Sequence, residues 1–379
     1  MTASCDVIVI GLGAMGSAAA YHLAKRGCKV LGVDRFTPPH SLGSSHGQTR
    51  IIREAYFEHP AYVPIVQRAY ELWDELAEES RRILFLQTGG LMIGPPEGIV
   101  AGGARRSAEL HRLNHEILAA SEVARRFPAL RPAEEMIAVW EPRAGILYPE
   151  ECISAHLALA RQHGANLKFQ EKVFRWEANE KEVRVHTDHG VYTANRLVLS
   201  AGSWLQSLLP ALNLSLVVER QVLFWFAPKT PAQFVPARCP IHLWEHSPGK
   251  FFYGFPDLGH GVKLAGHHEG EVSDPDSLRR EVEPAEVEGM RRLVRPFLPG
   301  LGDQLLEATT CLYTNTGDGH FLIDHHPAHP RVLIASPCSG HGFKFSCAIG
   351  EIIADLVQKG RSRFDLSLFR DRLFPTYHT

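Results

Sequence analysis

The first part of the chain alternates short apolar runs with glycine-rich breaks. Residues 6–10 (DVIVI) form a β-branched run typical of a strand buried in a parallel sheet. A glycine-rich turn at residues 11–16 (GLGAMG) leads into an apolar helix that reaches Arg26 and ends at Gly27. Residues 29–33 (KVLGV) form a second apolar run. The pattern predicts a strand, a turn, a helix and a second strand, the opening unit of a parallel α/β sheet.

Further along, the apolar pattern changes character twice. Residues 217–313 alternate in the manner of strands and are rich in aromatic side chains, which indicates a second lobe. After residue 330 the pattern again predicts a parallel strand followed by a helix, as in the first part of the chain. Helices are expected at residues 62–80, 150–163 and 343–359, the last ending at Gly360, and strands at 83–93 (a pair around Gly89 and Gly90), 196–200 and 331–335.

Composition narrows the class of protein. A chain of 379 residues is long enough for two domains, and 45% hydrophobic with 22% charged residues is typical of a soluble globular protein. Lys and Arg number 40 against 42 Asp and Glu, and no run of basic residues stands out. We therefore expect neither a nucleic-acid partner nor a membrane surface, and a small-molecule partner instead. No stretch of 18 apolar residues suggests a membrane span.

Cysteine usage and the N-terminal residues favour a cytoplasmic protein. The seven cysteines are odd in number and scattered, without a C-x-x-C pair, which argues against a disulfide framework and a structural metal site. The apolar residues 7–20 lack the basic segment that precedes them in a signal peptide, and glycines interrupt them. We expect a reducing cytoplasm and no bound metal.

The glycine-rich turn is a candidate phosphate-binding motif. Gly11, Gly13 and Gly16 have the spacing G-x-G-x-x-G between a strand and a helix, and Asp34 follows eighteen residues after the last glycine. The first glycine permits the tight turn, the second lets the backbone approach a pyrophosphate, and the third allows close packing of helix on strand. Asp34 is placed to accept hydrogen bonds from a ribose. The motif predicts a bound dinucleotide but does not choose between NAD and FAD.

Two arginines follow a long irregular loop at residues 35–49. Arg50 and Arg53 are three apart, so on a helix they would project from one face. A planar guanidinium beside a dinucleotide site could hold a substrate carboxylate with two hydrogen bonds. Lys344 lies in a glycine-rich turn at a predicted helix N-terminus, where it would reach the same cofactor.

The loop at residues 43–53 (GSSHGQTRIIR) resembles the signature loop of the monomeric sarcosine oxidase and N-methyltryptophan oxidase family of flavoproteins. The resemblance spans essentially the whole chain. It implies FAD attached covalently to a cysteine, and oxidation of N-methyl or cyclic amino acids by O2 to an imine and hydrogen peroxide. The other matching segments are YGFP at 253–256 followed by Lys263, CLYT at 311–314, HFLID at 320–324 and SGHGFKF at 339–345.

The resemblance also implies roles for single residues. Cys311 is in the position of the attachment cysteine. Arg53 and Lys344 match the residues that hold the substrate carboxylate, and Arg50 matches one that lies over the flavin. Lys263 matches a lysine on the flavin face opposite the substrate, where a cation favours electron transfer to O2.

A second group of residues is expected around the amine and the cofactor. His267 matches an active-site histidine near the amine, and Tyr253, Tyr313 and Leu243 are expected to line the substrate cavity. The start of the helix at 343 would direct its positive dipole end at the reduced flavin. The expected cofactor site comprises Gly11, Gly13, Ala14, Met15, Gly16, Asp34, Arg35, Ser44, His46, Thr49, Arg50, Val173, Gly202, Trp204, Cys311, Gly340, Gly342, Phe343 and Lys344.

Several alternatives stay open at the level of sequence. The candidate residues have ordinary structural interpretations: a buried apolar cysteine, a solvated basic face, surface lysines and a structural histidine. A flavin dehydrogenase, a non-catalytic flavin subunit passing electrons to a partner protein, and an NAD-dependent dehydrogenase are the rival functions. Pipecolate and fructosyl amino acids are alternative substrates. We expect the segment 243–246 with Phe252 and Tyr313 to set substrate choice, since Trp244 and His246 are bulky there.

The predicted fold class is α/β, with a discontinuous Rossmann-like FAD-binding domain and a second α+β substrate domain built on a largely antiparallel sheet. The FAD-binding domain is expected to comprise residues 1–82, 146–215 and 328–379. The substrate domain is expected to comprise residues 83–145 and 216–327. We expect a monomer whose partners are a small amino acid and O2.

Overall fold

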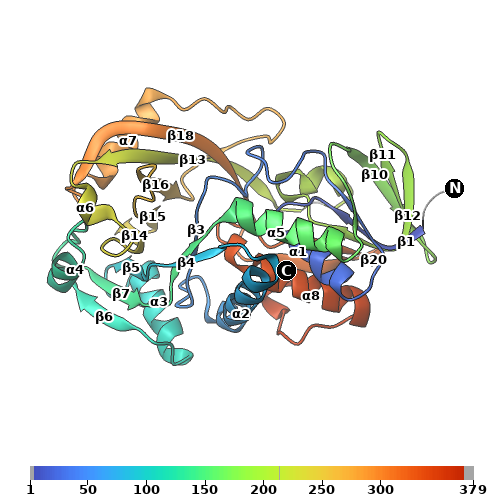
Figure 1. Ribbon diagram of the computed structural model, residues 1–379, viewed down its shortest axis with the longest axis horizontal. Helices are drawn as coiled ribbons and strands as arrows, with labels where there is room; N and C mark the ends of the chain where they lie inside the picture. The colour runs from blue at the N-terminus through green and yellow to red at the C-terminus, as the bar shows by residue number, and fades with distance from the viewer. Residues whose placement is uncertain (1–3, 213, 371–379) are drawn as a thin grey trace, which may run out of the picture.

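The computed structural model describes residues 4–212 and 214–370 and contains two large sheets, which lie at opposite ends of the molecule (Figure 1). In the first, an eight-stranded sheet, five strands run parallel in the order β9, β2, β1, β12 and β20. This is the predicted α/β sheet. The five are β1 (Ser4–Ile10), β2 (Val30–Val33), β9 (Asn166–Lys168), β12 (Val191–Leu199) and β20 (His329–Ser336).

Four helices pack together beside this sheet and share one apolar core with it. The helix expected at residues 62–80 is α2, and its apolar residues Ile65, Val66, Ala69, Tyr70, Leu72, Trp73 and Leu76 are all buried, as expected for an amphipathic helix. The last helix ends at Gly360, whose φ of +70° is the left-handed conformation that a glycine C-cap adopts without strain. The helices are α1 (Ala14–Lys25), α2 (Val63–Ser80), α5 (Pro149–Gln162) and α8 (Ser346–Lys359).

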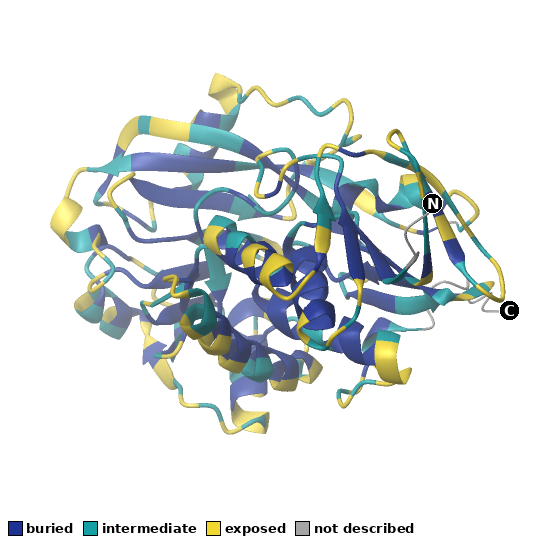
Figure 2. Cartoon of the chain, turned by 45° about the vertical axis from the view of Figure 1, so that its right-hand side comes forward, coloured by how far each residue is buried: buried dark blue, intermediate teal, exposed yellow. Residues whose placement is uncertain are grey.

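The second large sheet has nine strands and is antiparallel apart from the pair β14 and β5. Its alternating residues bury aromatic side chains such as Trp244 and Phe252. Figure 2 shows long stretches of these strands in the dark blue of buried residues. The strands are β5 (Gly90–Gly94), β6 (Glu116–Ala119), β7 (Ile137–Glu141), β13 (Val217–Pro228), β14 (Ile241–Ser247), β15 (Lys250–Gly254), β16 (Val262–His267), β17 (Glu271–Val272) and β18 (Leu301–Asn315).

Smaller elements complete the fold. A three-stranded antiparallel sheet in the order β3, β8, β4 lies between the two large ones. The hairpin of β10 and β11 extends the first sheet, and short helices accompany the second. Within the described ranges, no helix has the length and apolarity needed to cross a membrane. These elements are β3 (Arg50–Ile52), β4 (Phe85–Gln87), β8 (Gly145–Leu147), β10 (Val173–Ala178), β11 (Val183–Thr187), α3 (Ile99–Leu110), α4 (Ala120–Arg126), α6 (Pro231–Phe234) and α7 (Pro284–Val294).

One expectation about local structure is wrong. The strands predicted within residues 83–93 exist as β4 and β5 but do not pair with each other, because β4 pairs with β8 and β5 pairs with β14 and β7. Local periodicity indicated the strands without revealing their long-range partners. The condition under which Arg50 and Arg53 would share a helix face is not met, since β3 carries Arg50 and ends just before Arg53.

The predicted limits of the two domains stay a prediction. One of them, between residues 327 and 328, falls inside a hairpin, because β19 (Leu322–His326) pairs with β20 in the first sheet. The first three and last nine residues of the predicted FAD-binding domain, and residue 213 within it, lie outside the described residues.

The crossing of α1 and α8 generates a stability prediction. A Cβ atom on Gly350 would lie 2.6 Å from the carbonyl carbon and 2.7 Å from the Cβ of Ala18 on α1. We expect Gly350→Ala to lower the free energy of unfolding by about 1–3 kcal/mol through overpacking, despite the better helix propensity of alanine. Thermal unfolding of the holoprotein followed by circular dichroism measures the change.

Gly289 on α7 is the matched control. A Cβ there meets no atom within 4 Å, so Gly289→Ala should be stabilising by about 0.5–1 kcal/mol. Equal effects of the two substitutions would show that helix propensity, and not the contact between α1 and α8, decides the outcome.

Candidate active site

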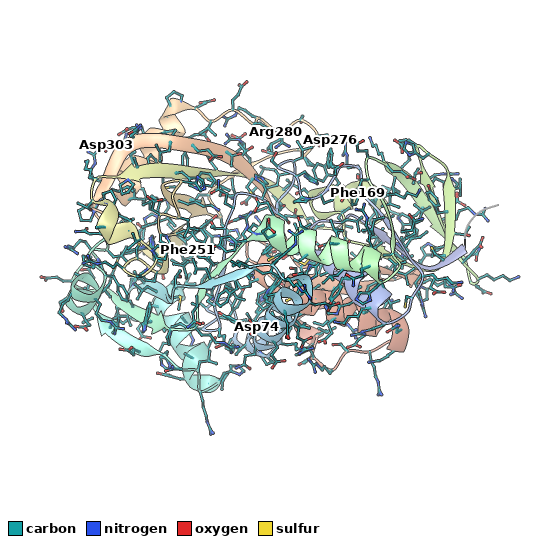
Figure 3. All side chains as sticks on the ribbon, viewed as in Figure 1. Asp74, Phe169, Phe251, Asp276, Arg280 and Asp303 are labelled. Carbon is teal, nitrogen blue, oxygen red and sulfur yellow. The ribbon has the colours of Figure 1, made fainter. Side chains whose placement is uncertain are left out.

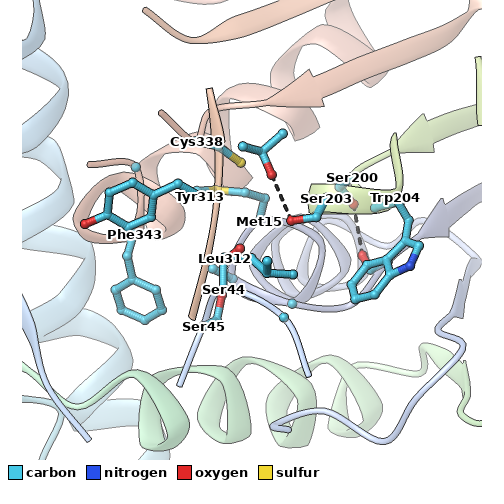
Figure 4. Close-up of a pocket in the computed structure, with 18 of the residues that line it drawn as sticks. Met15, Ser44, Ser45, Ser200, Ser203, Trp204, Leu312, Tyr313, Cys338 and Phe343 are labelled. Atoms are coloured by element: carbon cyan, nitrogen blue, oxygen red, sulfur yellow. Dashed lines mark hydrogen bonds between the residues drawn. The ribbon is translucent and has the colours of Figure 1, made fainter. Parts of the chain in front are cut away.

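A cavity of about 470 Å³ extends between the two large sheets, within the range typical of ligand sites. Phe343 and Tyr313 lie at one end of the part drawn in Figure 4 and Trp204 lies at the other. Most of the residues predicted from the sequence line it. They are Gly11, Gly13, Ala14, Met15, Asp34, Arg35, Ser44, Arg50, Arg53, Val173, Gly202, Trp204, Leu243, Tyr253, His267, Cys311, Tyr313, Gly340, Gly342, Phe343 and Lys344.

Four predicted residues lie behind the cavity wall. Gly16 packs under the glycine-rich turn, where a Cβ would overlap the carbonyl oxygen of Gly11 and lie 2.7 Å from Ser200 Oγ. His46 is buried, and burial together with Arg50 lowers its pKa to about 3. Thr49 and Lys263 contact each other in the layer next to Arg50. These residues can shape the cavity without touching what it holds.

The glycine-rich turn has the geometry of a pyrophosphate site. Gly11 has a φ of +85°, and a Cβ there would lie 2.6 Å from the carbonyl oxygen of Ser200. The first turn of α1 has neither a side-chain cap nor an acidic residue, so its free N–H groups face the cavity beside Gly13. Asp34 accepts hydrogen bonds from the N–H groups of Leu12 (2.7 Å) and Phe36 (2.8 Å), which aligns the turn with the end of β2.

Four residues close the end of the cavity opposite Tyr313 and Phe343 (Figure 4): Arg35, Phe36, Trp204 and Asp276. The sequence predicted Arg35 and Trp204 as site residues but not the other two. The guanidinium of Arg35 lies over the rings of Phe36 and Trp204 and pairs with Asp276 at 2.8 Å. Trp204 Nε1 donates to the same carboxylate oxygen at 2.8 Å. Asp276 belongs to the segment between β17 and α7, along which Figure 3 labels it and Arg280. It lies 242 positions after Asp34, in a stretch without a motif, so no sequence signal identified it.

Cys311 and Arg50 meet in the middle of the cavity wall. Arg50 Nη2 lies 3.5 Å from Cys311 Sγ and donates to the carbonyl oxygen of Ser44 at 2.7 Å, while its Nη1 donates to that of Thr49 at 2.8 Å. Cys311 is 2% exposed but borders the cavity. A cation thus lies directly beside a thiol that a ligand in the cavity can reach.

Arg53 and Lys344 form a second cationic group. Arg53 is buried and holds Glu58 through Nη2, at 2.8 Å to Oε1 and 2.7 Å to Oε2. Lys344 Nζ donates to the carbonyl oxygen of His341 at 2.7 Å and lies 3.4 Å from Tyr56 Oη. Burial lowers the pKa of Lys344 to about 7, and Arg53 acts in the same direction. Glu58, a counterion five residues after Arg53, was missed by the sequence analysis.

Tyr313 and His267 form a polar pair beside Lys344. Tyr313 Oη lies 3.1 Å from His267 Nδ1. Gly340, with a φ of +73°, leaves room for both rings, since a Cβ there would lie 2.6 Å from Tyr313 and 3.0 Å from His267 Cε1. Burial lowers the pKa of His267 well below its ordinary value, so the ring is neutral at physiological pH.

Lys263 is fully buried, so the interpretation as a surface lysine is wrong. Its ammonium donates to the carbonyl oxygens of Gly47 (2.6 Å) and Thr49 (3.0 Å) and to Thr49 Oγ1 (3.0 Å). It also lies over the rings of Trp225 and Phe255, at 5.2 and 4.9 Å from their centroids. Burial lowers its pKa well below the ordinary value, with Arg50 acting in the same direction.

The expectation that Trp244, His246 and Phe252 border the substrate is wrong. Alternate residues of a strand face opposite sides, so Leu243 and Tyr253 line the cavity while Trp244 and Phe252 stack on each other in the core of the second sheet. None of the three bulky side chains borders the cavity.

The geometry agrees with comparisons to known proteins. The family model for FAD dependent oxidoreductases (DAO) matches residues 6–356. Monomeric sarcosine oxidase of Streptomyces avermitilis is 45% identical over 377 residues, covering 98% of each chain. N-methyl-L-tryptophan oxidase of Salmonella arizonae is 36% identical over 368 residues, covering 96% of this chain and 98% of its own.

A solved structure shares the fold. The open form of NikD, an amino acid oxidase essential for nikkomycin biosynthesis, superposes with a TM-score of 0.84 over 99% of this chain and 98% of its own, at 24% identity. The combination of a full-length family match and close relatives leads to one assignment. The chain belongs to the family of FAD-dependent oxidoreductases that includes monomeric sarcosine oxidases and N-methyl-L-tryptophan oxidases.

Proposed function

We propose that this enzyme oxidises a secondary or cyclic α-amino acid at the C–N bond, with FAD as the electron acceptor and O2 as the oxidant of the reduced flavin. The observation that carries the proposal is the pair of cations, Arg53 and Lys344, in one cavity with the pyrophosphate turn and Cys311. The products are an imine, which water hydrolyses, and hydrogen peroxide.

The residues of the cavity fit FAD. The open N-terminus of α1 and the bare turn at Gly11 and Gly13 suit the pyrophosphate, and Asp34 suits a ribose. Cys311 would attach the flavin by a thioether, and Arg50 would lie against its ring. When bound, FAD supplies the two-electron acceptor for the C–H bond next to nitrogen and then the reductant of O2.

The protein would bind and orient the substrate through its carboxylate. Arg53 and Lys344 hold that group, while Tyr313 and neutral His267 face the amine and keep it uncharged. Since Arg53 already makes two hydrogen bonds to Glu58, the incoming carboxylate has to share or replace this partner. Removing substrate charge from water is favourable only because both cations are preorganised.

Lys263 would serve the oxygen reaction. Its ammonium is held by backbone and hydroxyl oxygens in the layer behind Arg50, where it places positive charge near electrons that pass to O2. Leu243 and Tyr253 form the wall against which the substrate side chain packs. We further propose a monomeric enzyme of the cytoplasm.

The substrate class is tested by peroxide release from purified wild-type protein with sarcosine, N-methyltryptophan, proline, pipecolate and fructosyl-glycine. We expect peroxide in a 1:1 ratio to the amine oxidised for at least one of the first four. Flavin reduction without peroxide would identify a dehydrogenase that needs a protein acceptor. Activity on none of the five would contradict the substrate class.

The covalent linkage is tested by acid precipitation. We expect wild-type protein to stay yellow in the pellet, whereas Cys311→Ser releases its flavin to the supernatant because oxygen replaces the attacking sulfur. Cys338→Ser is the control, since this second cysteine also borders the cavity. Free flavin from the wild type would exclude the linkage and leave the FAD site itself intact.

Carboxylate binding is predicted to depend on pH through Lys344. The probe is phenylacetate, a carboxylate that lacks the amine of the substrate. Lys344 is charged below its pKa of about 7 and neutral above it, so affinity for phenylacetate should be constant at low pH and fall as pH rises through 7. Because a charged hydrogen bond is lost, we expect the affinity for phenylacetate to fall by about tenfold or more over the whole range. His341, with a pKa lowered to about 4 by burial, does not titrate in this window.

Flavin absorbance titrations from pH 6 to 9 measure this dependence. Lys344→Met should bind weakly and lose most of the pH dependence, and Lys359→Met, at the exposed end of α8, should keep the wild-type profile. Glu141, which binds the N–H groups of the two residues after Arg53, has a pKa raised to about 7 by burial and also titrates in this range. A Lys344→Met protein that keeps the wild-type pH dependence would assign the titration to Glu141 or another group.

A further inference from the structure

Two glutamates outside the cavity hold the two ends of β3. Glu150, in the first turn of α5, accepts hydrogen bonds through Oε1 from the N–H groups of Gly47 (2.7 Å) and Gln48 (3.1 Å). Glu141, at the end of β7, accepts from the N–H groups of Glu54 (2.7 Å) and Ala55 (2.8 Å). Each carboxylate therefore fixes two consecutive peptide groups, one pair before the strand and one pair after it.

The turn held by Glu150 is strained. Gly47 has a φ of +93° and Gln48 a φ of +68°, and the second value is uncommon for a residue with a side chain. Such a conformation persists where surrounding contacts determine it, and two hydrogen bonds to one carboxylate do so here. Glu150 is also a carboxylate whose charge favours the protonated forms of both Arg50 and Lys263.

This turn supplies the acceptors for two cations of the site. The carbonyl oxygen of Gly47 accepts from Lys263, and that of Thr49 accepts from Lys263 and from Arg50. If the turn relaxes, both carbonyl oxygens move, and the three hydrogen bonds that they accept change together. The position of Glu150 is thus transmitted to Lys263 and Arg50 through the backbone.

Glu141 acts on the other end in the same way. It is 1% exposed, and burial raises its pKa to about 7 although its two N–H donors act in the opposite direction. Ala55, whose N–H it binds, also carries the carbonyl oxygen that accepts from Arg53 Nη1 at 3.0 Å. Arg53 is therefore held by Glu58 on one side and by a backbone anchored to Glu141 on the other.

We propose that Glu150 and Glu141 are positioning residues that serve different halves of the reaction. Glu150 positions Lys263 and Arg50 for the flavin and oxygen side, and Glu141 positions Arg53 for the substrate carboxylate. Neither glutamate borders the cavity, so both act through the peptide groups that they bind. This assignment rests on the function proposed above for the four cations.

The test compares two properties of the enzyme. The oxidative half-reaction is followed by the rate at which O2 reoxidises the reduced flavin, and the substrate side of the reductive half-reaction is followed by phenylacetate affinity. Both are measured in Glu150→Ala, Glu150→Gln, Glu141→Ala and Glu141→Gln. For Glu150→Ala we expect reoxidation of the reduced flavin by O2 to slow by about tenfold or more, with phenylacetate affinity unchanged within about twofold. For Glu141→Ala we expect phenylacetate affinity to fall by about tenfold or more, with the rate of flavin reoxidation unchanged within about twofold. The glutamine variants keep an acceptor oxygen and should recover part of each loss.

Hydrogen exchange followed by mass spectrometry gives a readout independent of turnover. Peptides covering residues 44–50 should lose protection only in the Glu150 variants, and those covering 53–57 only in the Glu141 variants. This readout and phenylacetate binding remain available if the wild type oxidises none of the amines tested, so failure of the proposed function is distinguishable from failure of this inference.

Each glutamate has a matched control. Glu151 is the next residue of α5, exposed and paired with Arg82, and Glu151→Ala should change neither half-reaction. Glu245 is buried in the second sheet and accepts from the N–H of Val100 at the start of α3, so Glu245→Gln should lower thermal stability without changing either half-reaction.

Equal effects of Glu150→Ala and Glu141→Ala on both half-reactions would overturn the inference and assign both residues to general stability. Wild-type reoxidation and wild-type protection of residues 44–50 in Glu150→Ala would overturn its Glu150 part. If the alanine variants do not fold, the glutamine variants take their place in the test. Hydrogen exchange, reoxidation rate and phenylacetate affinity that all stay at the wild-type values in both glutamine variants would also contradict the assignment.

Discussion

The arrangement of this molecule depends on keeping cationic side chains out of water around one cavity. Arg53, Lys263 and Lys344 are buried and Arg50 is half-buried. Isolating each such charge from water would cost several kcal/mol without compensating partners. The partners are mostly backbone carbonyl oxygens, with one carboxylate, Glu58, for Arg53. Since carbonyl oxygens carry only partial charge, they do not neutralise these cations as carboxylates would, so the cations can still attract anionic groups of cofactor and substrate.

This constraint explains why the chain is irregular where it is most important. Regular strands and helices use their carbonyl oxygens internally, so the acceptors for buried ammonium and guanidinium groups come from turns. Gly47, Thr49 and Ser44 supply them on one side of the cavity, and His341 supplies one on the other. The two large sheets act as rigid supports. Lys263 belongs to β16 of the second sheet, whereas Arg50, Arg53 and Lys344 sit on short segments outside both large sheets. A functional site of this kind combines a stable scaffold with locally strained loops.

The relatives identify the family, and the cavity shows which side chains of this chain a ligand would meet. In this chain the wall next to the cations is formed by Leu243 and Tyr253, while the large aromatic side chains of the same hairpin face the protein core. On the function proposed above, the cavity-facing residues of β14 and β15, and not the aromatic content of the segment as a whole, would limit the size of the substrate.

By itself the sequence determined the parallel sheet, the glycine-rich turn and a set of candidate site residues, most of which border the cavity. The sheet and the turn follow from local rules: β-branched runs, helix periodicity and the spacing of Gly11, Gly13 and Gly16. Cys311, His267 and the tyrosines of the cavity came from short motifs that resemble a known family. Tertiary structure alone decided that β4 and β5 join different sheets, that Lys263 is buried, and that Glu58, Asp276, Glu141 and Glu150 support the site. These facts depend on contacts between residues that are distant in sequence or on backbone geometry. An isolated glutamate carries no local pattern that reveals which N–H groups it will meet.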